Sequence, residues 1–221
     1  MISVLDHGYV RLVDSMGSDL SVVRSARVSH DAEWRTGEDE GKDEKLIRYL
    51  WKNNHVSPFE SVTFAFEVKA PIFVFRQWHR HKSWSFNEVS ARYSELPEEF
   101  YVPDLDQITT QSTSNKQMRT DEQHPEARTI AADIKEACHW AFQEYHQLID
   151  RGCPRELART VLPVGTYSRM FATCNLRSLF HFISLRQHQH SQYEIRVYAE
   201  AMLKLIEPIV PVSVVAFKDS L

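Results

Sequence analysis

The chain has 221 residues, of which 43% are hydrophobic and 25% are charged, with a formal net charge of −4 at pH 7. This composition is typical of an ordinary globular protein with a sizeable core, and the acidic balance argues against a protein that coats nucleic acid. The lack of an apolar run of about 18 residues excludes a membrane-spanning helix.

Apolar residues repeat every second residue in some segments and about every 3.6 residues in others, which separates expected strands from expected helices. In chain order, the sequence predicts a strand over residues 8–14, a helix over 19–28, a loop over 30–44, a helix over 43–53, a strand over 61–69, a mobile polar loop over 103–126, helices over 127–150 and 154–161, a strand over 166–173, and helices over 176–185 and 191–206. No repeat or linker interrupts this series. It predicts one α+β domain over residues 1–221, with a small antiparallel or mixed sheet flanked by several helices.

Residues 76–93 form a basic segment with three arginines, one lysine and two histidines against a single acid. The preceding Pro71 predicts a helix start, which would place Arg76 and Arg80 four residues apart on one helical face. Like charges at this spacing repel unless an anion lies between them. The segment therefore predicts a bound phosphate or carboxylate, and a solvated basic surface is the alternative.

A second basic region, residues 151–196, contains seven arginines and no lysine. Arginine offers a planar fork suited to phosphate, carboxylate or a pyrimidine edge. Helical spacing puts Arg186 on a largely apolar side, so we expect it to be partly buried. A buried guanidinium needs a partner, which is either a structural carboxylate such as Glu156 or Glu194, or a ligand.

Several other kinds of site are not indicated. The spacing of His181, His188 and His190 matches no metal-ligand pattern, so no metal site is predicted. Six unclustered glycines exclude a Rossmann fingerprint or a P-loop. The three cysteines have no C-x-x-C spacing, no activating partner and no secretory leader before them, which predicts a reducing cytoplasm and no covalent nucleophile.

One motif is similar to that of a known family. Arg80-His81-Lys82, followed by seven residues and Ser90, resembles the Arg-His-Arg-x7-Ser signature of the flavin-dependent thymidylate synthases. The resemblance covers nearly the whole chain and departs from the family at Lys82, which replaces the last arginine, and at His181, where some members carry Asn. Lys82 keeps the charge but loses the guanidinium fork. The other matching segments are residues 55–60, 154–163, 175–178, 185–186 and 192–196.

The resemblance implies reductive methylation of dUMP to dTMP, with methylenetetrahydrofolate as carbon donor, FAD as hydride carrier and NADPH as reductant. It also implies a homotetramer with shared active sites and no enzyme nucleophile. The implied FAD contacts are His55, Ser57, Arg80, His81, Lys82, Glu88, Asn175, Arg177 and His181. The implied dUMP contacts are Gln77, Arg80, Glu88, Ser90, Arg92, Arg159 and Arg186.

Among these residues, Arg186 is the expected catalytic group, because its guanidinium can stabilise the negative charge that develops when uracil N3 loses its proton. Ser90, Arg92 and Arg159 are expected to bind the monophosphate. Two other function classes remain open. A single-strand or RNA-binding module would also interleave arginines with aromatic rings, and a non-catalytic scaffold would use its arginines to join subunits. Neither alternative requires a bound, yellow flavin.

Overall fold

The computed structural model describes residues 1–221 and has an α+β architecture, with a five-stranded antiparallel sheet, a two-stranded hairpin and eight α-helices. The strands are β1 (Ile2–Val4), β2 (Gly8–Met16), β3 (Thr63–Pro71), β4 (Trp84–Glu88), β5 (Thr109–Gln111), β6 (Arg119–Gln123) and β7 (Tyr167–Asn175). The α-helices are α1 (Asp19–Arg27), α2 (Glu40–Lys52), α3 (Ile72–Trp78), α4 (Ala127–Asp150), α5 (Arg155–Ala158), α6 (Leu176–Arg186), α7 (Tyr193–Ile206) and α8 (Pro211–Lys218). Short 3-10 helices are η1 (Val28–His30), η2 (Glu33–Arg35), η3 (Ser57–Ser61), η4 (Leu105–Gln107) and η5 (Arg159–Val161).

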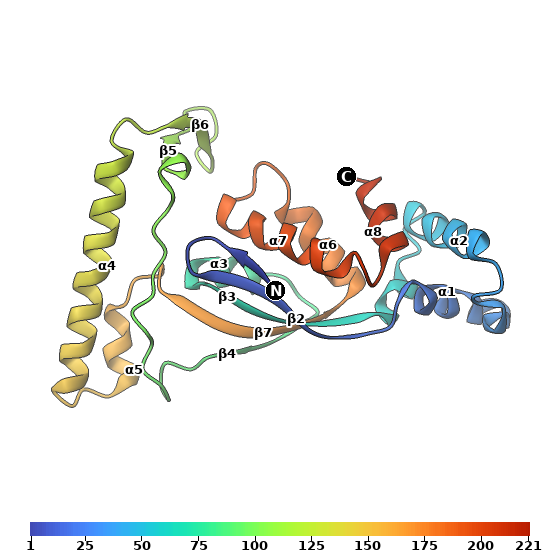
Figure 1. Ribbon diagram of the computed structural model, residues 1–221, viewed down its shortest axis with the longest axis horizontal. Helices are drawn as coiled ribbons and strands as arrows, with labels where there is room; N and C mark the ends of the chain where they lie inside the picture. Colours follow the sequence, from blue (N-terminus) through green and yellow to red (C-terminus); the bar gives the residue numbers. More distant parts are fainter.

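The sheet has the strand order β1-β2-β3-β7-β4, and every neighbouring pair is antiparallel. The central pair, β3 and β7, runs in register from Thr63 opposite Asn175 to Pro71 opposite Tyr167. The strand predicted over residues 61–69 is confirmed as β3, and Phe64 and its other alternating apolar residues are fully buried. In Figure 1, α6 and α7 lie above this sheet, and α4 stands with α5 at one end of it.

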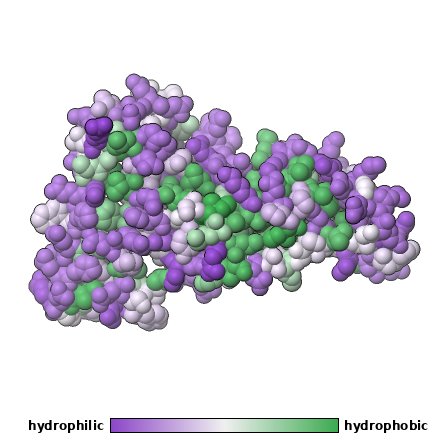
Figure 2. All heavy atoms as spheres, in the orientation of Figure 1, coloured by the Kyte–Doolittle hydropathy of each residue, from purple (hydrophilic) through white to green (hydrophobic).

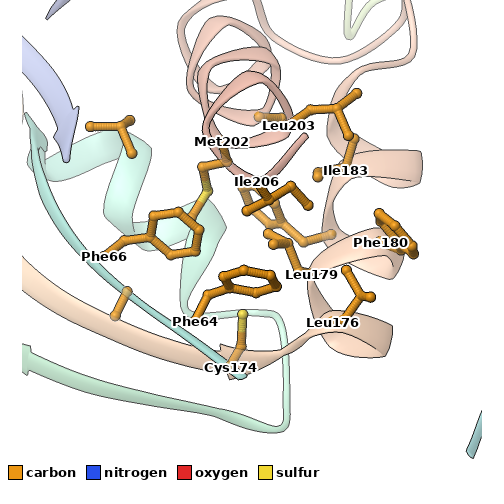
Figure 3. Close-up of a cluster of buried hydrophobic side chains, with 14 of the residues drawn as sticks. Phe64, Phe66, Cys174, Leu176, Leu179, Phe180, Ile183, Met202, Leu203 and Ile206 are labelled. Carbon is orange, nitrogen blue, oxygen red and sulfur yellow. The ribbon is translucent and has the colours of Figure 1, made fainter. Parts of the chain in front are cut away.

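The main core lies between the sheet and the two helices α6 and α7 (Figure 3). The buried face of β3 meets apolar side chains that recur every three or four residues on both helices. Burial of each large apolar side chain contributes about 1.5–3 kcal/mol, so this contact fixes α6 against β7. The labelled side chains in Figure 3 are Phe64, Phe66, Cys174, Leu176, Leu179, Phe180, Ile183, Met202, Leu203 and Ile206.

Most predicted elements are present, with shifted ends, but residues 103–126 differ from the expected loop. They contain η4 and the β5–β6 hairpin. Arg119 fastens this hairpin by donating hydrogen bonds to the Gln107 carbonyl at 2.9 Å and to the buried Glu194 carboxylate at 3.2 Å. The Gln111 side chain donates to the Met118 carbonyl at 2.7 Å. Side-chain bonds to backbone groups thus order a segment that has little apolar periodicity.

The expected loop over residues 30–44 is likewise partly regular. It contains η2, and α2 begins inside it at Glu40, because the Asp39 side chain caps the helix by accepting from the Lys42 backbone N–H at 3.1 Å. None of the helices combines the length and the apolar composition needed to cross a lipid bilayer.

Candidate active site

The basic signature lies in a turn and not on a helix, which corrects the expectation for Arg80. Helix α3 ends at Trp78, and the chain reverses at Ser83, whose backbone is left-handed with φ of 64°. The reversal lets Trp84 and Phe86 pair with β7 as strand β4, and this aromatic edge strand outweighs continuation of the helix. The helical pairing expected for Arg76 and Arg80 is therefore wrong.

The turn lines a cavity of about 840 Å3 together with α6, η3 and α8. Six of the residues expected to contact FAD lie on its wall, and so does Arg186. The first half of the chain supplies Arg80, His81 and Lys82. The start and first turns of α6 supply Asn175, Arg177 and His181.

The N-terminus of α6 opens onto this cavity. Asn175 caps the helix by accepting a hydrogen bond from the Ser178 backbone N–H at 2.8 Å, and both residues line the cavity. The partial positive charge of a helix N-terminus favours an anion, and Arg177 of the first turn adds a full charge. The one acidic side chain on the wall, Glu60, pairs with Arg177. The cavity is therefore cationic and suits phosphate groups.

Arg186 is partly buried, as predicted, and no carboxylate pairs with it. Its Nε donates to His81 Nε2 at 2.9 Å, and its Nη2 donates to the Gln77 carbonyl at 3.3 Å. Burial, followed by the nearby Arg80 cation, lowers the pKa of Arg186 below its ordinary value. The sequence left open whether a structural carboxylate or a ligand pairs with Arg186. The two carboxylates considered pair with other residues, Glu156 with Arg92 and Glu194 with Arg119.

His81 is the buried member of the signature, with 7% of its surface exposed. Burial, the Arg186 cation and His181 together lower the pKa of His81 to about 4, so the imidazole is neutral at physiological pH. Its ring packs edge-on against Phe182, with ring centroids 4.9 Å apart. A neutral ring whose Nε2 accepts a hydrogen bond carries its proton on Nδ1.

The other expected site residues do not reach this cavity within one chain. Glu88 ends β4, and Ser90 and Arg92 follow it. Arg92 pairs with Glu156 of α5 at 3.0 Å, which puts this group beside Arg159 in η5. Strand β4 thus runs from the cavity to a second, exposed cluster of basic residues near α5. Three further expected residues are not on the wall. His55 and Ser57 flank the wall residue Val56, and the Gln77 carbonyl contacts the wall residue Arg186.

Sequence reasoning missed part of the cavity wall. Glu60 belongs to a segment that resembles the family, but its ion pair with Arg177 spans more than half the chain and leaves no local pattern. The aromatic end of the cavity, formed by Trp51, Phe180 and Phe217, comes from three helices. Their spacing looks like ordinary core spacing, and two of the rings, Phe180 and Phe217, do stack in the core at 4.4 Å.

The tryptophans of the basic segment pack as core residues. Trp78 is fully buried and stacks on Phe182 with ring centroids 4.7 Å apart, and Trp84 lies against both rings. No group of three His, Cys, Asp or Glu side chains lies close enough together to hold a metal ion. His188 and His190 are exposed, and their ring centroids lie 4.7 Å apart.

The fold and the cavity together define an α+β protein whose cationic site suits a large phosphorylated ligand. The chain belongs to the thymidylate synthase complementing protein family, whose model matches residues 11–212. It is 44% identical over 217 residues to the flavin-dependent thymidylate synthase of Thermotoga neapolitana, covering 98% of this chain and 93% of the relative. The enzyme of the same name from Gluconobacter oxydans is 43% identical over 220 residues, covering 98% and 72%.

A solved structure agrees with this assignment. The UMP/dUMP methylase PolB from Streptomyces cacaoi, bound with 5-Br dUMP, has a TM-score of 0.90 and 41% identity, covering 99% of this chain and 97% of that chain. These similarities confirm the predicted family and favour the enzyme over the RNA-binding module and the scaffold.

Proposed function

We propose that this chain is a flavin-dependent thymidylate synthase that converts dUMP to dTMP by reductive methylation. Methylenetetrahydrofolate donates the carbon, NADPH supplies the reducing equivalents, and FAD carries the hydride when it is bound. The observation that carries the proposal is the cationic cavity in which Arg186 lies partly buried without a carboxylate. A cation in this state needs an anionic ligand, and a phosphorylated cofactor with an anionic substrate provides it.

The wall residues suit the parts of a flavin dinucleotide. Arg177, Lys82 and the N-terminus of α6 would hold the diphosphate. His81 and His181 would hydrogen-bond to polar groups of the cofactor. As a point charge, Lys82 would bind phosphate without the bidentate geometry of the arginine that the family signature carries there. His55 and Ser57 would complete the site from its edge, and Glu88 would come from a second copy of the chain.

The phosphate group of dUMP needs the second basic cluster, which one chain does not bring to the cavity. We propose that a homotetramer does so, with a second copy contributing Glu88, Ser90, Arg92 and Arg159. Arg80 and Arg186 would act from the cavity wall, and Gln77 from beside Arg186, whose guanidinium its carbonyl already contacts. In Figure 2, hydrophobic atoms gather in the middle of the visible face. An extended apolar area of this kind on a protein surface supports self-association.

Within the assembled site, Arg186 would act on the uracil ring. Its uncompensated charge would stabilise the anion formed when N3 loses its proton, which makes the ring carbon a better nucleophile without a covalent enzyme adduct. Glu88 would orient hydroxyl and amide groups of the nucleotide.

The direct test is to purify the full chain, record its visible spectrum and assay dTMP formation. We expect a yellow protein that converts dUMP to dTMP when methylenetetrahydrofolate and NADPH are present and does not when either is omitted. A parallel assay with UMP separates the two nucleotides named for PolB. A colourless protein that also fails to take up added FAD would contradict the proposal.

The three cysteines are expected to be dispensable for the chemistry. All are free, and burial raises the pKa of both Cys138 and Cys174, so neither thiol is activated. Free thiols also suit the reducing cytoplasm in which we place the protein. A variant with all three cysteines changed to alanine should keep kcat within about threefold of the wild type, whereas removal of a true nucleophile lowers kcat by orders of magnitude. Circular dichroism checks that the variant is folded.

A further inference from the structure

We propose that His81 is a positioning residue for Arg186, which it orients by accepting a hydrogen bond at Nε2 without neutralising the guanidinium charge. The inference rests on the proposed function of Arg186. The carrying observation is that both groups holding this guanidinium, His81 Nε2 at 2.9 Å and the Gln77 carbonyl at 3.3 Å, are uncharged acceptors.

The chemistry explains why neutral acceptors matter here. A carboxylate would orient the guanidinium equally well, but its negative charge would compensate the positive charge that the substrate anion needs. A neutral imidazole and a backbone carbonyl fix the orientation of the Arg186 guanidinium and do not compensate its positive charge. The Gln77 carbonyl lies in the last turn of α3 and carries no net charge.

Contacts on its backbone and on its ring hold His81 in place, so it can fix the orientation of Arg186. Its backbone N–H donates to the Trp78 carbonyl at 2.9 Å, and its ring lies edge-on to Phe182 and 6.2 Å from the ring of His181. Nδ1, which must carry the proton, donates to no group of the chain. That N–H is therefore available to an acceptor on a ligand in the cavity, so one ring would contact the cofactor and aim Arg186.

The charged surroundings keep the imidazole in the accepting state. Arg186 and His181 of α6 face the ring, and Arg80 and Lys82 flank it in the turn. Glu60, the acidic side chain on the cavity wall, is engaged by Arg177 and not by His81. A proton on Nε2 would add a further cation to this group and would destroy the acceptor at the same time.

The test compares His81→Gln, which keeps a neutral acceptor on a side chain of similar reach, with His81→Leu, which has none. Turnover is expressed per bound flavin to remove any loss of cofactor. We expect H81Q to stay within about tenfold of the wild type, since only one hydrogen bond is weakened. We expect H81L to lose about a hundredfold in kcat, since a misplaced catalytic group costs this much. Equal losses in both variants would overturn the inference.

The same pair of changes is then made in an Arg186→Leu background, where the side chain at position 186 has no N–H to donate. There the residual turnover of H81Q and H81L should differ by less than about threefold, because the interaction that distinguishes them is gone. A difference as large as in the wild type would show that His81 acts through some other group.

A measurement without turnover completes the test. In flavin-free full chain labelled with 15N-histidine, NMR should show the His81 proton on Nδ1 and no protonation between pH 8 and 5. In Arg186→Ala, loss of the neighbouring cation should raise the pKa of His81 toward its ordinary value. A proton on Nε2 in the wild type would refute the inference. If the flavin-loaded wild type makes no methylated nucleotide, the proposed function fails, and the NMR result alone decides the role of His81.

Discussion

Replacement of Arg186 by alanine is expected to lower dTMP formation by about a thousandfold while FAD remains bound. The guanidinium supplies charge where the uracil anion develops, and loss of one such donor costs about a hundred- to a thousandfold in kcat. The cofactor should stay because Arg80, Lys82 and Arg177 still line the cavity. Single-turnover kinetics under saturating dUMP, with the flavin content taken from the visible spectrum, measure the two effects separately.

Arg24→Ala provides the matched control, because Arg24 is exposed on α1 and makes no ion pair. It should leave both rate and flavin content unchanged. Near wild-type turnover in Arg186→Ala would show that the catalytic role is misassigned. Loss of flavin together with turnover would instead make Arg186 a cofactor-binding residue.

Replacement of Trp78 by alanine is expected to lower the free energy of unfolding by about 3–5 kcal/mol, since it leaves a large cavity in a packed core. Trp78 is fully buried, stacks on Phe182 and lies directly before the turn that carries the basic signature. That loss is a large part of the about 5–15 kcal/mol that stabilises a typical domain. Urea unfolding at one fixed protein concentration measures it.

Trp34→Ala is the comparison for this prediction, since the same side chain is 70% exposed at that position. Its effect should stay below about 1 kcal/mol, the range of an exposed ring with one cation–π contact, which here is to Arg35. Equal decreases in the free energy of unfolding of the two variants would mean that Trp78 does not stabilise the core next to the site.

The elements that could be predicted are those with a long, regular apolar pattern. Helix α4 and strand β3 follow from periodicity alone, because their buried faces repeat without interruption. The sequence does not predict strands β1, β4, β5 and β6 or helix α8. Five residues of β4 lie inside a charged segment and pair with β7 only at the sheet edge, so their alternation is too short to outweigh the helical pattern before them.

The candidate site divides in the same way. Residues of the contiguous signature and of the first turns of α6 could be predicted, and they meet in one cavity because α6 begins directly after the strand that pairs with β4. Arg186 could be placed as partly buried from helical spacing. Its neutral partners could not be predicted, since His81 and Gln77 lie about a hundred residues away in the chain and no local rule joins them.

The register of the central strand pair has a consequence for biosynthesis. Thr63 meets Asn175, so half the length of the chain separates the two strands at the middle of the sheet. A ribosome must therefore complete most of the polypeptide before Phe64 and Phe66 can be covered. During that interval the apolar segment of β3 is exposed and can associate with other nascent chains. Pairing between strands so far apart in the chain also slows folding. Yield in a host should accordingly depend on chaperone supply and on a lowered growth temperature.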